Sequence, residues 1–202
     1  MNANTLLTKT ADTLHEIHDL LKQRWSPRAF SSAPVPHHAL KKLFEAARWS
    51  PSASNIQPWA FVVATQNDPE AFSRVAGLLN PNNARWAAKS PVLIIAVLNK
   101  NNPAGAHNDW AAYDLGQAVA HLSVQAEALG LSVHQMGGFD RARAHEALGL
   151  PETHEALTAI AIGYQGELAD LPEDLQTRET AARSRKPQSE FVFEGTWNEP
   201  LN

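Results

Sequence analysis

The sequence predicts an α/β (α+β) fold in which a central mixed sheet of four to five strands is layered by helices. Three apolar runs rich in β-branched residues predict strands, at Trp59–Ala64, Val92–Leu98 and Leu157–Ile162. Segments with apolar residues at helical spacing alternate with these runs, and this alternation is typical of a sheet covered by helices. The chain has 202 residues, 44% of them apolar, so it can bury a substantial core.

In the first third of the chain, apolar residues recur at helical spacing in two segments. Asp12–Arg24 predicts an amphipathic helix that ends before a Ser-Pro break. His37–Trp49 predicts a second helix. It leads into a polar loop, Pro51–Pro58, which we expect to hold one shape because proline fixes φ and restricts the residue before it. Trp59–Ala64 follows this loop as a predicted buried strand.

The middle of the chain predicts a helix over Asp68–Leu79, a turn over Asn80–Asn83 and the strongest strand signal at Val92–Leu98. A long helix is expected over Asn108–Leu129, capped by Asn108 or Asp109 and stopped by Gly130. This helix is apolar over most of its circumference, which places it in the centre of a domain or in a subunit interface.

The last third predicts a strand at Leu131–Gln135, a glycine turn over Met136–Phe139 and a helix that Asp140 caps. After Leu157–Ile162, residues 164–202 show little apolar periodicity but carry a few aromatic residues. We therefore expect one domain over residues 1–202, with residues 164–202 as an extended segment. That segment wraps either its own domain or a second copy of the chain.

Composition argues against several classes of protein. The formal net charge of -4 and the pI near 6.1 argue against a nucleic-acid binder. The chain has no cysteine, which excludes disulfides, thiolate nucleophiles and cysteine-ligated zinc. Apolar runs fall short of the roughly 20 residues of a membrane helix, and Met1–Lys9 lacks the pattern of a secretory leader. A cytoplasmic protein without nucleic-acid or membrane partners is expected.

Familiar catalytic signatures are missing. The sequence contains no G-x-S-x-G elbow, no G-x-x-x-x-G-K-[ST] loop and no G-x-G-x-x-G fingerprint. His15 and His18 are one residue too close for the H-E-x-x-H zinc pattern, so a solvated helix face is the favoured interpretation and no metal site is expected.

Three polar clusters, distant in sequence, remain as candidates for chemistry. They are Arg24-Trp25-Ser26-Pro27-Arg28, the loop at Pro51–Pro58, and Arg183-Ser184-Arg185. Forked guanidinium donors match phosphate oxygens, so four arginines with small hydroxyls suit a phosphomonoester. Taken alone, an arginine pair is better interpreted as a surface pair, and the loop slightly better as a stiff connection between helix and strand. Their combination is the specific signal.

The order of these clusters resembles that of the nitroreductase family of flavoenzymes. The resemblance rests on Arg24-x-Ser26-x-Arg28, Pro51–Trp59, Met136–Asp140 and Arg183-x-Arg185, and it extends from about Leu20 to Trp197. It implies a nitroreductase-like fold and a homodimer that binds two flavin mononucleotides (FMN) at the subunit interface. It also implies that the C-terminal segment extends onto the partner subunit.

The resemblance further implies which residues touch the flavin. One subunit would contribute Arg24, Trp25, Ser26, Arg28, Gln135, Gly137, Gly138, Arg183 and Arg185, and the other Pro51, Ser52, Ala53, Asn55 and Gln57. Many relatives carry glutamate where this chain has Gly137, but the backbone N–H expected near the reactive flavin nitrogen is kept. Roles for Asn82 and Arg85 are left open.

The implied activity is electron transfer from NADH or NADPH to nitroaromatic, quinone or related acceptors. Without a separate dinucleotide domain, both substrates would use the same space over the flavin in turn, which predicts ping-pong kinetics. Arg24 is the candidate for the positive charge near the flavin N1–C2 edge. Trp110 and Tyr113 either border the substrate space or pack an interface. The alternatives are a related flavoenzyme of dehalogenating, flavin-fragmenting or enoyl-reducing chemistry, or a flavin-binding protein without efficient turnover.

Overall fold

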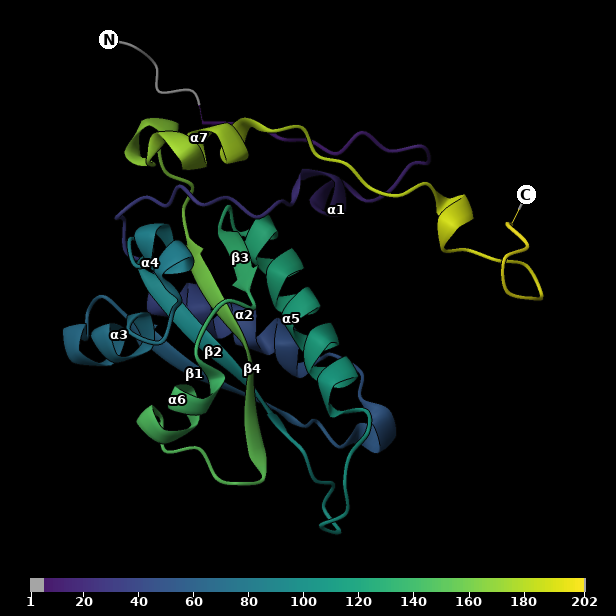
Figure 1. Ribbon diagram of the computed structural model, residues 1–202, viewed down its shortest axis with the longest axis horizontal. Helices are drawn as coiled ribbons and strands as arrows, with labels where there is room; N and C mark the ends of the chain where they lie inside the picture. The colour runs from purple at the N-terminus through teal and green to yellow at the C-terminus, as the bar shows by residue number, and fades with distance from the viewer. Residues whose placement is uncertain (1–5, 202) are drawn as a thin grey trace.

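The computed structural model describes residues 6–201, and the expectation for Met1–Lys9 lies largely outside that range (Figure 1). Within residues 6–201, four strands form one sheet in the order β1-β2-β4-β3. Their bounds are β1 Trp59–Thr65, β2 Val92–Asn99, β3 Ser132–Met136 and β4 His154–Gly163. The layered α/β fold is confirmed.

Each pair of neighbouring strands in this sheet is antiparallel, so the mixed pairing expected from the sequence is wrong. A mixed sheet would contain parallel as well as antiparallel neighbours. However, β4 inserts between β2 and β3, so the helical crossover joins two strands that run in the same direction without pairing. Strand order is decided by long-range contacts, which local periodicity does not record.

Helices cover both faces of the sheet and create two apolar cores (Figure 1). On one face pack α2 (His37–Arg48) and α5 (Ala111–Ala128). On the other pack α3 (Pro69–Ala76), α4 (Pro81–Ala87) and α6 (Arg141–Ala147). Strand β2 is buried along nearly its whole length because both of its faces are covered, which explains its continuous apolar sequence.

Strand β1 lies at the edge of the sheet, and its predicted burial is wrong in this chain. Only Ala64 of its residues is buried, while Ala60 and Val63 are exposed. The apolar sequence of an edge strand and that of a central strand are hard to distinguish, because burial depends on what covers the strand.

Helix α1 spans only Asp19–Gln23, where Asp12–Arg24 was predicted. The Nδ1 atom of His18 accepts the N–H of Leu20 at 3.2 Å and caps the helix there. Upstream, Leu14 is 82% exposed, so the part of the chain that the structure describes offers this stripe no surface to pack against. Amphipathic periodicity alone does not stabilise a helix without such a surface.

Asn80–Asn83 begins helix α4 instead of forming the predicted turn. The Asn80 side chain accepts the N–H of Asn83 at 2.9 Å, and Pro81 occupies the first helical position. Asparagine at the cap and proline directly after it are both favoured at helix starts. The same residue types favour turns, which is why the local sequence was ambiguous.

Beyond β4 the chain is extended, with two short 3-10 turns, η2 (Leu168–Asp170) and η3 (Gln188–Glu190), and helix α7 (Glu173–Thr180). Helix α7 was not predicted because it buries only Leu175 and Glu179 and so has little apolar periodicity. The tail after α7 extends away from the sheet and its helices (Figure 1). Across residues 6–201, none of the helices is both long and apolar enough to traverse a lipid bilayer.

Candidate functional site

The segment that carries Arg24 and Arg28 lies against helix α7 of the C-terminal region. The Glu179 Oε1 atom accepts the backbone N–H of Arg28 at 2.6 Å and that of Ala29 at 3.2 Å. The Arg28 Nη1 atom donates to Glu179 Oε2 at 3.3 Å, and Glu179 is only 2% exposed. Arg28 is therefore anchored by a buried carboxylate that lies 151 residues away, and nothing in the local sequence identified this partner.

Arg183 holds the N-terminal region through backbone carbonyls. Its Nη1 atom donates to the Lys9 oxygen at 2.6 Å and to the Lys22 oxygen at 3.1 Å. The pKa of Arg183 lies below its usual value, first because of burial and then because of the like charges of Arg24 and Arg185. Because Arg183 binds the carbonyl of Lys22, two residues before Arg24, the structure brings together Arg24, Arg183 and Arg185, which we call the arginine cluster, from opposite ends of the chain.

Carboxylates balance this positive charge only in part. Glu127, in the last turns of α5, feels the charges of Arg24 and Arg183, but burial dominates and raises the pKa of its carboxyl group. Burial also lowers the pKa of Lys9, which is attracted by Glu179 and repelled by Arg183 and Arg28. Guanidinium groups held together against their mutual repulsion are suited to an anion with several oxygen atoms.

Between Arg24 and Arg28, Trp25 and Ser26 are half-buried and Pro27 is buried, and the segment is held from two sides. The Lys9 ammonium lies 4.9 Å from the centre of the Trp25 ring. The His134 Nδ1 atom lies 2.9 Å from the Pro27 oxygen, so it carries the proton and donates it to this carbonyl. Burial lowers the pKa of His134 to about 4, and its ring packs on Trp86 with 4.4 Å between ring centroids. The neutral side chain of His134 therefore links the segment that contains Ser26 to β3.

The two glycines after β3 differ in their surroundings. A Cβ atom at Gly137 would meet no described atom within 4 Å, so the backbone here is open. A Cβ atom at Gly138 would collide with the side-chain amides of Asn80 and Asn83, and the Gly138 oxygen accepts the Asn83 amide at 2.9 Å. A side chain at position 138 would therefore displace the asparagine side chains at the start of α4. Gln135 is exposed and donates to Ser123 Oγ at 3.2 Å.

Asn82 and Arg85, whose roles at the flavin were left open above, are both exposed on α4. Arg85 forms a two-pronged ion pair with Asp174, with N–O distances of 2.6 and 3.0 Å, so its guanidinium group is engaged with α7. Asn82 faces solvent at the start of the same helix.

The loop from Pro51 to Pro58 has a strained and well-braced backbone. Ser54, Asn55 and Gln57 have φ values of 51°, 56° and 54°, in the left-handed region that side chains disfavour. The Gln57 N–H donates to Ser52 Oγ at 3.0 Å, and its side-chain amide donates to the Asn55 oxygen at 3.1 Å. The single shape expected from the prolines is thus secured by hydrogen bonds. Pro51, Asn55 and Gln57 are exposed.

The loop and the arginine cluster lie at opposite ends of α5. The Ala53 N–H donates to Asp114 in the first turn of this helix, whereas Glu127 near the arginine cluster lies thirteen residues further along. At 1.5 Å per residue the two positions are about 20 Å apart. Figure 1 shows α1 and the tail beside the C-terminal end of α5. Within one chain, the predicted contact residues therefore form two separate groups.

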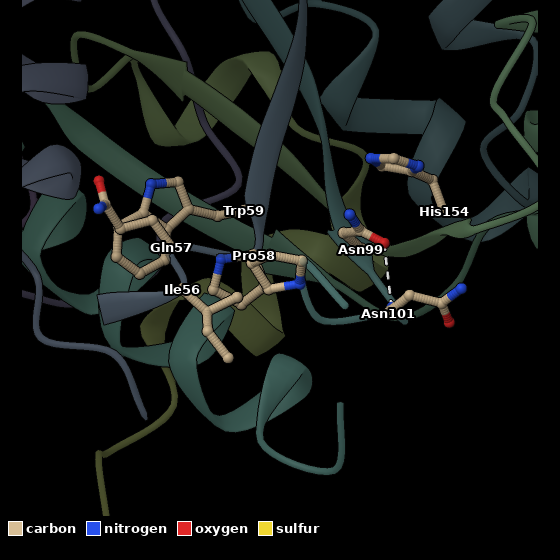
Figure 2. Close-up of a pocket in the computed structure, with 8 residues that line it drawn as sticks. Ile56, Gln57, Pro58, Trp59, Asn99, Asn101 and His154 are labelled. Atoms are coloured by element: carbon tan, nitrogen blue, oxygen red, sulfur yellow. Dashed lines mark hydrogen bonds between the residues drawn. The ribbon is translucent and has the colours of Figure 1, made fainter. Parts of the chain in front are cut away.

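A pocket of about 170 Å³ opens beside the loop (Figure 2). Figure 2 shows the loop residues Ile56 to Trp59 on one side and Asn99, Asn101 and His154 on the other. The Asn101 N–H donates to Asn99 Oδ1 at 3.0 Å. Gln57 is the only predicted contact residue among the described residues that line this pocket, so the pocket does not coincide with the predicted flavin site.

Trp110 and Tyr113 project from the start of α5, 59% and 65% exposed. Their rings meet edge to face with centroids 6.2 Å apart. Among the described residues, nothing buries either ring in the core, and both are largely accessible on the surface.

Comparison with known proteins gives the family. A chain in a crystal structure described as an oxidoreductase containing FMN aligns with 98% of this chain and 99% of its own, with a TM-score of 0.88 and 33% identity. An uncharacterized 15.4 kDa protein of Mycolicibacterium smegmatis is 32% identical over 65% of this chain and 88% of its own. A Thermus thermophilus protein named NADH dehydrogenase is 29% identical over 73% and 85%. The family model named Nitroreductase matches residues 21–164, and the chain therefore belongs to the nitroreductase family of oxidoreductases.

Proposed function

We propose that this protein is an FMN-dependent oxidoreductase that transfers electrons from NADH or NADPH to nitroaromatic, quinone or related acceptors. The observation that carries the proposal is the arginine cluster: Arg183 binds the carbonyl of Lys22, two residues before Arg24, so arginines from distant parts of the chain lie in one region. A phosphate monoester is a ligand that such a cluster fits. The likeness to an oxidoreductase containing FMN supports FMN as the source of that phosphate.

The proposed FMN contacts fit the described geometry. The arginine cluster and Arg28, with Trp25 and Ser26, would hold the phosphate and ribityl chain, and Arg24 would place positive charge near the flavin N1–C2 edge. The open backbone at Gly137 leaves room for a flat ring, with Gln135 and Gly138 on either side. Bound FMN supplies the redox chemistry, while these residues bind and orient it.

The second group of contacts, Pro51, Ser52, Ala53, Asn55 and Gln57, is proposed to reach the flavin of a partner subunit. The distance of about 20 Å along α5 supports this division, because one chain does not bring its loop to its own arginine cluster. Apolar side chains exposed on α1, α5 and the tail, such as Leu21, Tyr113 and Trp197, support a homodimer. We propose that each chain forms one domain over residues 1–202, with 164–202 extending onto its partner, in a cytoplasmic enzyme.

We further propose that donor and acceptor occupy the same space in turn. Ping-pong kinetics follow from this, with parallel double-reciprocal lines at several acceptor concentrations. Intersecting lines would contradict the shared space.

Spectroscopy of the purified protein tests the activity. We expect flavin absorption bands, bleaching by NADH or NADPH without oxygen, and recovery on addition of a quinone or nitroaromatic acceptor. A protein that cannot be loaded with FMN would refute the proposal. Bound flavin that neither nucleotide bleaches would indicate a flavin-binding protein without turnover.

A double variant tests the phosphate contacts. Arg28→Ala combined with Arg185→Ala should release FMN, since both guanidinium groups are lost from the proposed phosphate site. Arg74→Ala is the matched control, because Arg74 forms an exposed ion pair with Glu70 on α3. Wild-type FMN affinity in the double variant would contradict the assignment, whatever the change in its thermal midpoint.

A further inference from the structure

Asp114 links the loop to the rest of the fold. It lies in the first turn of α5, is 1% exposed, and accepts the backbone N–H of Ala53 through Oδ2 at 3.1 Å. Within residues 6–201, this is the one hydrogen bond that joins residues 51–57 to a part of the chain outside the loop. At the end of the loop the Pro58 oxygen accepts the Asn99 N–H at 2.8 Å, and the remaining hydrogen bonds of residues 51–57 join residues within the loop.

The backbone that follows Ala53 needs such an anchor. Ser54, Asn55 and Gln57 are all left-handed within four positions, and none of them is glycine. Conformations of this kind persist only where the surroundings fix them, and they gather at ligand-binding sites. Because Ala53 opens the 3-10 turn η1 (Ala53–Asn55), its N–H is the point at which the strained stretch begins.

A carboxylate at this position is not explained by packing. Burial of a carboxylate is unfavourable unless hydrogen bonds compensate it, whereas the neighbouring buried residues Ala111, Leu115 and Ala118 simply fill the core. The compensating contact recorded for the Asp114 side chain is the one to Ala53. The side chain is therefore better matched to holding the loop than to stabilising α5.

We infer that Asp114 is a positioning residue for the cofactor site. It fixes the Ala53 N–H, and through it the left-handed backbone that presents Ser52 and Asn55 to FMN. This inference rests on the proposed function, in which residues 51–57 form one wall of the flavin site. Asp114 is not itself a proposed flavin contact.

Three variants distinguish the effect of the hydrogen bond between Asp114 and Ala53 from the effect of the negative charge on Asp114. Asp114→Ala removes the acceptor, while Asp114→Asn keeps an oxygen that can accept the N–H. Ala53→Pro removes the donor at the first position of η1, where proline is tolerated, and Ser52 already has the extended backbone that precedes proline (φ -148°, ψ 153°). Asp68→Ala is the matched control, since Asp68 accepts the Ala71 N–H, also at 3.1 Å, at the start of α3.

The FMN dissociation constant and the visible circular dichroism of bound FMN are measured for each full-length protein. Loss of a hydrogen bond to a carboxylate should weaken FMN binding about tenfold to a hundredfold in Asp114→Ala. Asp114→Asn should stay within about threefold of wild type, and Asp68→Ala should match it. Dichroism at saturating FMN should change in Asp114→Ala and not in Asp68→Ala.

Coupling between the two partners gives the decisive result. If they act through one hydrogen bond, Asp114→Ala should add little to the effect of Ala53→Pro, so the double variant binds FMN as the weaker single variant does. Full additivity would overturn the inference even if one variant folds poorly. Wild-type affinity and dichroism in Asp114→Ala would overturn it while leaving the proposed function intact. A wild-type protein that binds no FMN would overturn both.

Discussion

Replacement of Glu179 tests whether the C-terminal region holds the segment around Arg28. Glu179→Ala removes the acceptor for the backbone N–H groups of Arg28 and Ala29 and for the Arg28 guanidinium. With Glu179 2% exposed and the Arg28 side chain 26% exposed, water reaches the vacated site poorly. Each orphaned buried group costs about 1–3 kcal/mol, and breaking a buried ion pair costs about 3–5 kcal/mol. We expect unfolding free energy to fall by about 3–5 kcal/mol.

Glu179→Gln sharpens this expectation. The amide oxygen can still accept one or both backbone N–H groups, but as a neutral acceptor it binds them more weakly. A smaller loss, about 1–2 kcal/mol, follows from the difference between hydrogen bonds to charged and to neutral acceptors.

Urea unfolding followed by tryptophan fluorescence provides the assay. Flavin-free protein at one fixed concentration is needed, because bound ligand and subunit association both change apparent stability. Glu45→Ala is the control: Glu45 binds Arg48 within α2, but this ion pair is exposed, so its removal should not measurably change the midpoint. A Glu179→Ala midpoint that corresponds to a loss below about 1 kcal/mol would refute the assigned role.

Two further predictions concern the neighbourhood of β3. Burial lowers the pKa of His134 to about 4 in the folded chain, whereas the unfolded chain has the ordinary value of 6.5. The unfolded chain therefore takes up the proton first, and stability should fall by roughly 3 kcal/mol from pH 6.5 to pH 4. His134→Gln, which does not titrate, should flatten the pH dependence of the urea midpoint, and an equal slope would contradict the buried neutral state. Gly138→Ala should displace the Asn80 cap of α4 and cost about 1 kcal/mol, whereas Gly137→Ala, with open space around it, should not. Equal thermal midpoints would show that Gly138 is not needed for packing.

Local signals were sufficient wherever neighbouring residues decide the structure. The apolar run of β2, the face of α2 and the Asp140 cap of α6 all appear where the sequence predicts them. Proline at both ends of the loop predicted a fixed shape, which its hydrogen bonds support. Each of these features depends on side chains within a few positions of one another.

Local sequence patterns predicted the wrong structure where a segment's conformation depends on packing against a distant part of the chain. The stripe around Leu14 has helical periodicity, yet α1 is short because none of residues 6–201 covers Leu14. The Asn-Pro sequence at residue 80 fits both a turn and a helix start, and the packing of α4 against the sheet selects the helix. Strand order likewise depends on β4 entering between β2 and β3.

The sequence by itself determined the family motifs and the chemical character of the candidate site, because arginine pairs, small hydroxyls and glycines keep their chemistry in any fold. Only the tertiary structure decided which groups meet. It joined Arg28 to Glu179, carried Arg183 to the carbonyls of Lys9 and Lys22, and placed Asp114 under Ala53. These partners are 61 to 174 residues apart, and contacts at such separations are set by how the layers pack, which short-range periodicity does not encode.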